Sequence, residues 1–229
     1  MDSLTYPGEA YFSYTARPDH LGEGMLQMDA LTCNYPSHRT IIVMDVENST
    51  ARTNPGRAQI RRAMYELIEI ASRMSGVTSE NRDPLVDRGD GVIMLIHPVD
   101  RLPKTMLLSR FIPCLARLLA DHNRRNPNVG FRLRIAMHAG EVHFDHWGPF
   151  GESVDLACRL VDAAEFRAWL RMRRAPLALV VSDDVYSTMV NHGYKGIEAL
   201  FFHRVVHVDL AGYSEFGWVS VPPLVGVNC

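Results

Sequence analysis

The chain has few cysteines, and none of them stands in a pattern that builds a site. Cys33, Cys114, Cys158 and Cys229 lie far apart, with no Cys-x-x-Cys pair and no histidine at the spacing of a metal site. Disulfide-stabilised secreted domains and zinc modules both need cysteines in closer, paired arrangements. The sequence therefore excludes a disulfide framework and a zinc cluster, and it favours a reducing, cytoplasmic location.

An excess of one charge and a long apolar run are also lacking. The 229 residues carry 24 Lys and Arg against 26 Asp and Glu, a formal net charge of -2. Proteins that bind a nucleic-acid backbone usually show a clustered basic face, whereas the arginine pairs of this chain are typical of solvated helix faces. No stretch reaches the roughly 20 apolar residues that cross a bilayer. We expect neither a nucleic-acid partner nor insertion into a membrane.

Length and composition predict one folded domain. Hydrophobic residues make up 47% of the chain and charged residues 22%, which is enough to bury one sizeable core and too little for two. Residues 1–37 contain three prolines and no periodicity, and they lack the basic and apolar segments of a secretory leader. We expect an irregular extension over 1–37 and a single domain over 38–229.

Hydrophobic periodicity predicts a mixture of strands and helices. The order strand-helix-strand-strand-helix-strand is that of an α+β fold with a ferredoxin-like split βαβ core, a mixed or antiparallel sheet with helices packed on one face. Gly140 is interpreted as a turn between two of the strands. The predicted strands are 40–46, 91–96, 131–137, 141–143, 177–181, 201–208 and 218–221, and the predicted helices are 60–71, 107–119, 154–164 and 183–190.

Two aspartates interrupt strands that are otherwise apolar. Asp45 follows the run 41–44, and Asp90 stands between two glycines just before the run 92–96. Each has an ordinary structural explanation when taken alone, as a cap of the following turn or a support for a glycine-flanked bend. A lone carboxylate in such a strand is unfavourable, however, and a pair of them supplies the hard oxygen ligands that Mg²⁺ and Mn²⁺ prefer. Together they predict a two-metal site that handles a nucleoside triphosphate.

Polar residues directly after Asp45 suit phosphate oxygens. Asn48, Ser49 and Thr50 offer backbone N–H groups before the next helix begins, and Arg52 lies within reach of the same place. Arg57 lies within similar reach. Both arginines are equally well explained as ordinary surface residues.

Four segments resemble, in order and spacing, the catalytic domain of the class III nucleotidyl cyclases, the adenylate and guanylate cyclase family. Residues 45–50 are similar to the family's Asp-x-x-Gly-Phe-Thr, and Arg-Gly-Asp at 88–90 is similar to its Gly-Asp. Residues 133–142 resemble Leu-Arg-Val-Gly-(x)₃-Gly-x-Val, and 151–160 resemble Gly-(x)₂-Val-Asn-x-Ala-x-Arg-(Leu or Met). The resemblance covers roughly 39–221. It implies an enzyme that makes a 3′,5′-cyclic nucleotide from a nucleoside triphosphate and releases pyrophosphate.

The resemblance also implies roles for single residues. Asp45, Asp90 and the Val46 carbonyl would bind two Mg²⁺ or Mn²⁺ ions, which lower the pKa of the attacking ribose 3′-hydroxyl. Arg159 takes the position of the arginine that stabilises charge on the α-phosphate in the transition state; its alternative is a helix-surface arginine. Asp155 replaces the family asparagine that orients the ribose. Because the family's active sites form at a head-to-tail dimer interface, the resemblance implies a homodimer in which Asp45 of one subunit meets Arg159 of the other.

Several positions depart from the family pattern. The two base-reading positions hold Val86 and Gly148, neither of which has a side chain that can hydrogen-bond a purine edge. Asp155 places an anion at the asparagine position, and Asp209 aligns roughly with the family's triphosphate-binding lysine. These changes spare Asp45, Asp90 and Arg159.

Two explanations of these departures compete. One is an active cyclase with a pyrimidine substrate, UTP or CTP, resembling the bacterial cyclases that signal phage infection; Asp87, Arg88 or a residue near Trp147 would then read the smaller base. The other is a degenerate, non-catalytic cyclase-homology domain that acts as a nucleotide sensor or dimerisation module. Retention of both aspartates favours activity, because an unused buried carboxylate pair destabilises a fold through mutual repulsion.

Overall fold

The computed structural model describes residues 35–210 and 212–224. Most of the predicted extension over 1–37 therefore lies outside the described residues, and the first strand begins at Ser37. The strands are β1 (Ser37–Val46), β2 (Val86–Asp87), β3 (Gly91–Ile96), β4 (Leu133–Asp145), β5 (Gly148–Phe150), β6 (Leu177–Ser182), β7 (His203–Leu210) and β8 (Tyr213–Ser220). The α-helices are α2 (Asn54–Met74), α3 (Lys104–Met106), α4 (Ile112–Arg125), α5 (Glu152–Asp162), α6 (Ala164–Arg171) and α7 (Asp183–Thr188), and a π-helical turn η2 (Leu107–Phe111) joins α3 to α4. Short 3₁₀ turns are η1 (Ser49–Ala51), η3 (Pro127–Val129), η4 (Val190–His192) and η5 (Ala199–Phe201).

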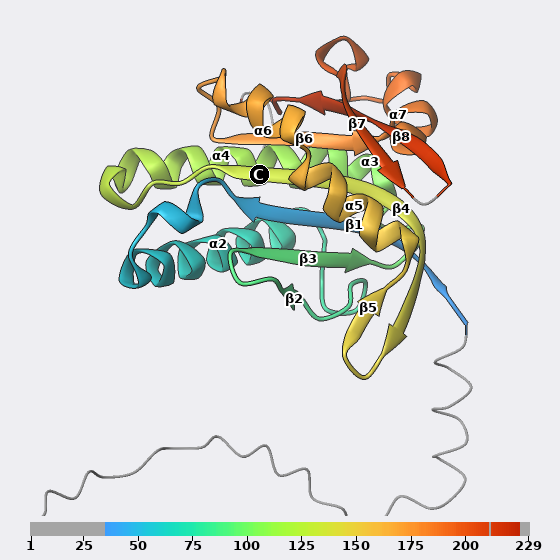
Figure 1. Ribbon diagram of the computed structural model, residues 1–229, viewed down its shortest axis with the longest axis horizontal. Helices are drawn as coiled ribbons and strands as arrows, with labels where there is room; N and C mark the ends of the chain where they lie inside the picture. The colour runs from blue at the N-terminus through green and yellow to red at the C-terminus, as the bar shows by residue number, and fades with distance from the viewer. Residues whose placement is uncertain (1–34, 211, 225–229) are drawn as a thin grey trace, which may run out of the picture. The chain divides into compact units, whose positions relative to one another are not determined.

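The sheet confirms the predicted α+β fold with a split βαβ core. Its strand order is β2-β3-β1-β4-β6-β8-β7, with β5 paired to the far end of β4 (Figure 1). β1 lies between β3 and β4 and is antiparallel to both, and β2 is antiparallel to β3. β1 and β2 are therefore parallel with β3 between them, and β3 and β4 are parallel with β1 between them. These are two interleaved βαβ units, one closed by α2 and the other by α4.

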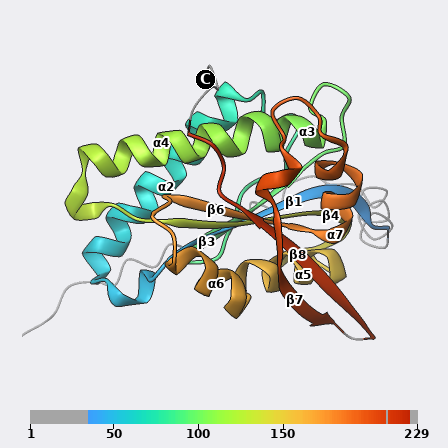
Figure 2. The same cartoon turned by 90° about the horizontal axis from the view of Figure 1, so that it is seen from above.

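Helices cover both faces of the sheet, so the prediction of helices on one face is wrong. Figure 2 shows the sheet with α2 and α4 on one side and α5 and α6 on the other. The side chains of β1 alternate between the two layers: Ile42 and Met44 pack into the core under α2 and α4, and Ile41 and Val43 pack into the core under α5 and α6. A strand buried on both faces reads as a continuous apolar run, which does not reveal how many helical layers cover it.

Gly140 does not make a turn, contrary to the sequence interpretation. β4 runs unbroken through it from Leu133 to Asp145 and pairs with β1 along much of this length. A Cβ at Gly140 would collide with the Ser153 hydroxyl, and it would lie 3.0 Å from the Ser153 Cβ. The glycine is therefore explained by the close approach of α5 to the sheet, a packing constraint that a local reading takes for a bend.

Helix α2 confirms its predicted amphipathic pattern and extends it in both directions. Thr53 is the N-cap, and its hydroxyl accepts a hydrogen bond from the Gly56 N–H at 3.4 Å. Pro55 lies in the first turn, where a missing N–H costs nothing. The apolar positions at helical spacing, Ile60, Met64, Leu67, Ile68 and Ala71, are all buried. This packing fixes the loop between β1 and α2 beside the strand ends.

Within the described residues, every helix is too short or too polar to cross a bilayer.

Candidate functional site

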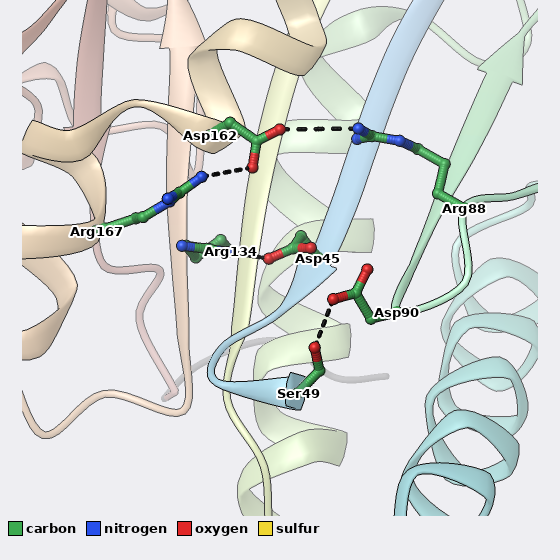
Figure 3. Close-up of polar contacts among 7 residues, drawn as sticks. All are labelled: Asp45, Ser49, Arg88, Asp90, Arg134, Asp162 and Arg167. Atoms are coloured by element: carbon green, nitrogen blue, oxygen red, sulfur yellow. Dashed lines mark hydrogen bonds and ion pairs between the residues drawn. The ribbon is translucent and has the colours of Figure 1, made fainter. Parts of the chain in front are cut away.

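Asp45 and Asp90 lie together because their strands pair. Asp45 is opposite Gly91 in the β1–β3 register, and Asp90 directly precedes that glycine. The Val46 N–H donates to the Asp90 carbonyl oxygen at 3.1 Å, which closes the ladder at this end. A Cβ at Gly91 would collide with the Met44 carbonyl oxygen, so glycine is needed for the strands to approach. The carboxylates sit at the ends of neighbouring strands (Figure 3).

The two carboxylates differ in their surroundings. Asp45 is only 9% exposed, whereas Asp90 is exposed. Burial is the largest influence on the Asp45 carboxyl and raises its pKa above the ordinary value; the hydrogen bond from Arg134 opposes this, and the negative charge of Asp90 adds to it. A cation placed between the two aspartates would offset both the burial and the repulsion.

Arg134 is the internal partner of Asp45. It stands opposite Asp45 in the β1–β4 register, and its guanidinium forms a buried ion pair with the carboxylate, with Nε 3.1 Å from Oδ2. Both side chains point into the same space, as Figure 3 shows. This contact leaves one oxygen of Asp45, Oδ1, without a hydrogen bond to the described part of the chain.

The segment after Asp45 forms a tight turn toward Asp90. Asn48 adopts a left-handed conformation with φ of 55°, the only non-glycine residue of the described chain with positive φ, and Asn is among the residue types that tolerate it. The turn brings the Ser49 hydroxyl to 2.5 Å from Asp90 Oδ2, where it donates a hydrogen bond. Of the predicted phosphate-binding residues, Ser49, Thr50 and Arg52 line one pocket together with Asp90.

That pocket has a volume of about 540 Å³ and lies between α2, the β1–α2 loop and the β2–β3 turn. Helix α2 holds the turn in place. Arg61 donates to the Gly89 carbonyl and forms an ion pair with Asp87, and the Tyr65 hydroxyl donates to Asp87 at 3.0 Å. Among the lining residues Arg52, Arg57, Arg61 and Arg88 are basic and Asp90 alone is acidic. The walls of the pocket are therefore suited to an anion.

The donor set fits hard divalent cations that share their coordination with a substrate. The described residues contain no group of three or more His, Cys, Asp or Glu side chains that could hold a metal ion by themselves. Two carboxylates with the nearby Ser49 hydroxyl and Val46 carbonyl match the habit of Mg²⁺, which takes one or two protein carboxylates and completes its shell with phosphates and water. Asp45, Asp90 and Val46 therefore remain the residues that would hold such ions.

Arg159 and Asp155 lie elsewhere on the chain, on the exposed face of α5. Arg159 donates to the backbone carbonyl of Asp209 at 3.0 Å, and no hydrogen bond or ion pair within residues 35–210 and 212–224 joins it to either aspartate of the pair. The Asp209 carboxylate accepts a hydrogen bond from Ser214 at 2.7 Å. One chain thus does not bring Arg159 to the carboxylates, and the predicted contact in trans stays a prediction.

The two base-reading positions have structural explanations of their own. Val86 is half-buried on β2 opposite Ile93 and packs against the core under α5 and α6. Gly148 has a φ of 133°, a conformation that residues with a Cβ rarely adopt, and its N–H donates to Asp145 at 3.0 Å in the β4–β5 turn. The glycine is therefore demanded by the hairpin, whatever the ligand.

Sequence reasoning missed two charged contacts of the site. The first is the ion pair of Arg134 with Asp45. The sequence assigned no role to Arg134, although a charged side chain in a largely apolar strand is the same signal that drew attention to Asp45. The second is a bridge over the carboxylates, in which Asp162 lies 3.7 Å from Arg88 and 3.0 Å from Arg167 (Figure 3). No local pattern reveals this bridge, because it joins the β2–β3 turn to the end of α5 and the start of α6.

Comparison with known proteins supports the fold. No protein-family model and no curated protein sequence matches the chain. Among solved structures, the adenylyl cyclase CyaB from P. aeruginosa matches with a TM-score of 0.56 and 11% identity, over 80% of this chain and 94% of that one. An adenylate/guanylate cyclase/hydrolase from Silicibacter pomeroyi matches with a TM-score of 0.52 and 18% identity, over 82% and 98%. The catalytic core of a rhodopsin-guanylyl cyclase in complex with ATPalphaS matches with a TM-score of 0.54 and 13% identity, over 83% and 99%. The chain thus has the α+β fold of class III cyclase catalytic domains, and identities this low establish the fold alone.

Proposed function

We propose that this protein is a nucleotidyl cyclase, which converts a nucleoside triphosphate into a 3′,5′-cyclic nucleotide and pyrophosphate. The observation that carries the proposal is the convergence of Asp45 and Asp90 at two paired strand ends beside an arginine-lined pocket of about 540 Å³. Carboxylates that hold divalent cations and guanidiniums that hold phosphates are the groups that phosphoryl transfer requires. Because these side chains lie on a cyclase fold, the fold and the chemistry of the site support the same function.

In the proposed reaction the ribose 3′-oxygen forms a bond to the α-phosphorus. The bond from that phosphorus to the bridging oxygen of the β-phosphate breaks, pyrophosphate leaves with the electron pair, and the 3′-hydroxyl proton passes to water. Two bound Mg²⁺ or Mn²⁺ ions would lower the pKa of the 3′-hydroxyl and neutralise phosphate charge. The β1–α2 turn would position the phosphates: Ser49 and Thr50 line the pocket, Asn48 shapes the turn through its left-handed conformation, and Arg52 contributes positive charge at the pocket wall.

The second subunit of a homodimer completes the proposed site. Arg159 is exposed and permanently charged, and no hydrogen bond or ion pair in the described part of the chain joins it to Asp45 or Asp90, as expected for a residue that acts on a neighbouring subunit. It would stabilise charge on the α-phosphate, and Asp155, one helical turn away on the same exposed face, would orient the ribose.

A pyrimidine substrate and a role in anti-phage signalling extend the proposal. Val86 and Gly148 place no hydrogen-bonding side chain at the positions that read a purine in the resembled family. A site without those polar groups does not discriminate in favour of a purine, and UTP or CTP is then the proposed substrate. The signalling role rests on the resemblance to bacterial pyrimidine cyclases.

The test incubates purified full-length protein with Mn²⁺ and ATP, GTP, CTP or UTP in parallel and separates the products by chromatography. We expect a cyclic product from UTP or CTP, and none from the Asp45→Ala or Asp90→Ala variants. Glu66→Ala, which removes an exposed carboxylate of α2 outside the pocket, is the control and should retain activity. Absence of product from all four substrates would reject the proposal.

One observation favours a second function. The Arg134 guanidinium already neutralises Asp45, so this carboxylate has a partner without any metal ion. A non-catalytic nucleotide sensor or dimerisation module would keep such a pair for stability alone. Binding of nucleotide without turnover, unaffected by removal of divalent cations, would support this second function.

A further inference from the structure

A second pocket, larger than the one beside the carboxylates, lies on the sheet face that α2 and α4 cover. Its volume is about 870 Å³, within the usual range for small-molecule sites. Its walls come from the end of α2, the η2 turn with the start of α4, strand β6, the loop before β7 and the chain at and after the end of β8. No described residue lines both pockets, so the second is a separate site.

Pro113 shapes one wall of this pocket. It has no N–H to donate to the carbonyl of Ser109, four residues earlier, and a proline ring collides with a regular helical turn at that position. The helix departs from α geometry just before the proline, in the π-helical turn Leu107–Phe111. This turn supplies Leu108, Ser109 and Arg110 to the pocket wall. Turns of this kind are rare and occur often at functional sites.

The loop between η4 and η5 packs closely on the π-helical turn. Gly196 has a φ of 83°, which residues with a Cβ rarely adopt, and a Cβ there would lie 3.1 Å from the Ser109 Cβ. Lys195 and Glu198, on either side of this glycine, both line the pocket. The glycine therefore explains how two charged residues of the loop come to the same cavity as Arg110.

The interior of the pocket is apolar and contains two buried hydroxyls. The buried apolar lining residues include Leu108, Ile112, Leu179 and Pro222. Ser75 and Ser220 also line the pocket and are each 4% exposed, and neither side chain has a hydrogen bond within the described residues. A buried hydroxyl without a partner is unfavourable, so both are available to a bound molecule.

The charged lining residues leave the pocket with an excess of one positive charge. Arg110, Lys195 and Glu198 are the charged residues among those that line it, two cations against one carboxylate, and all three are exposed. None of the three has an ion pair within residues 35–210 and 212–224. The two cations are therefore available to a ligand with a single negative charge, whereas Glu198 would repel a ligand with several.

We propose that this pocket binds a small amphipathic carboxylate. The apolar body of the ligand occupies the interior, and its carboxylate is held by Arg110 and Lys195. An arginine guanidinium binds a carboxylate through two parallel hydrogen bonds, and a lysine ammonium adds a compact charge. The burial of the apolar body supplies affinity, and the two cations select the head group. The site lies outside the residues of the proposed reaction and does not depend on that reaction.

The test is calorimetric titration of the full-length protein with octanoate, 1-octanol and octylammonium, which share a chain length and differ in the head group. We expect one octanoate to bind per subunit, at least tenfold more tightly than 1-octanol, and octylammonium to bind most weakly. The Arg110→Gln/Lys195→Gln variant should bind octanoate at least tenfold more weakly and 1-octanol with unchanged affinity. Arg62→Gln/Arg125→Gln removes the same charge from exposed positions outside the pocket and should change the octanoate affinity less than twofold.

A gain-of-binding variant separates ligand contact from structural damage. Glu198→Gln removes the repulsive carboxylate and should tighten octanoate binding by about threefold while leaving 1-octanol binding unchanged. If the double variant of the pocket does not fold, Glu198→Gln decides the question. Equal affinities of the parent for octanoate and 1-octanol, or no octanoate binding by the parent, would overturn the inference. So would equal octanoate affinities in the two double variants, or an unchanged octanoate affinity in Glu198→Gln.

Discussion

The Nε atom of Arg134 lies 3.1 Å from Oδ2 of Asp45, and the two residues are 8% and 9% exposed. The candidate metal carboxylate is thus paired with a cation from the neighbouring strand of its own chain. Because each charge is removed from water, each depends on the other, and the pair is both a structural element and a part of the candidate site.

Replacing Arg134 with methionine should destabilise the protein strongly. The substitution leaves Asp45 buried without its partner, and breaking a buried pair from one side typically costs about 3–5 kcal/mol. Urea unfolding at pH 7 measures this loss. Asp45→Asn combined with Arg134→Met should recover a substantial part of the stability, since no unpaired charge remains. A loss below about 1 kcal/mol for Arg134→Met would contradict a tight pair.

Gly91→Ala should separate the two strands at the carboxylate pair. The new Cβ meets the Met44 backbone carbonyl, which cannot move without displacing β1, and we expect a loss of about 1–3 kcal/mol together with loss of any cyclase activity. Gly56→Ala is the matched control. Its Cβ would lie 3.4 Å from the Thr53 hydroxyl, an ordinary contact at a helical position, so it should be neutral or slightly stabilising. Thermal unfolding of the two variants is the measurement, and equal melting temperatures would argue against this account.

His138 should make the protein less stable in mild acid. Burial lowers its pKa from the ordinary 6.5 to about 4, and its Nδ1 lies 2.8 Å from the Ser182 hydroxyl oxygen. Between these two pH values the unfolded chain binds a proton and the folded chain does not, so the free energy of unfolding falls as the pH is lowered from 6.5 to 4. The contribution approaches roughly 3 kcal/mol at the acidic end.

The His138 effect is measured as a difference between variants, because other groups titrate over the same range. Asp184 raises the pKa of His138, whereas Lys104 and His38 lower it. His138→Gln should flatten the dependence of unfolding free energy on pH between 6.5 and 4, and His146→Gln, at an exposed turn position, should leave it unchanged. The same slope in all three proteins would show that His138 titrates normally.

Subunit mixing should restore activity lost in single variants. If Asp45 and Arg159 act across a dimer, a mixed dimer of Asp45→Ala and Arg159→Ala subunits contains one intact site and one doubly defective site. At equal mixing about half of the dimers are mixed, so roughly a quarter of the parent activity should return when each variant alone has none. If activity stays absent after subunit exchange has been demonstrated, Asp45 and Arg159 do not act together in one site across the dimer.

Much of the fold could be predicted from local patterns. The strand Gly91–Ile96 was placed at its observed bounds, and β1 and α2 were each placed within their observed ranges, because long apolar runs and strong helical periodicity dominate these segments. The helix predicted over 107–119 covers the π-helical turn η2 and the first part of α4. The break at Gly140 was wrong. A glycine that avoids a clash with Ser153 and a glycine that allows a turn look the same in the sequence.

The candidate site, too, could be predicted from the sequence only in part. Asp45 and Asp90 were recognised because a carboxylate in an apolar strand is locally conspicuous, and pairing of β1 with β3 brings them together. Arg134 and Asp162 were not recognised, because their significance lies in partners 89 and 74 positions away in the chain, Asp45 and Arg88.

The amino-acid sequence by itself determined the α+β class, the split βαβ order and the two acidic strand ends, since each follows from the period of apolar residues and from charges that break it. Tertiary structure decided that helices cover both faces, that Arg134 neutralises Asp45, and that arginines from α2 and the β2–β3 turn enclose one pocket. The physical reason is the separation along the chain of the residues that interact. Periodicity and propensity depend on neighbouring residues, which the sequence shows directly. Charge pairing and pocket shape depend on strand register and helix placement, which are fixed only when the chain packs.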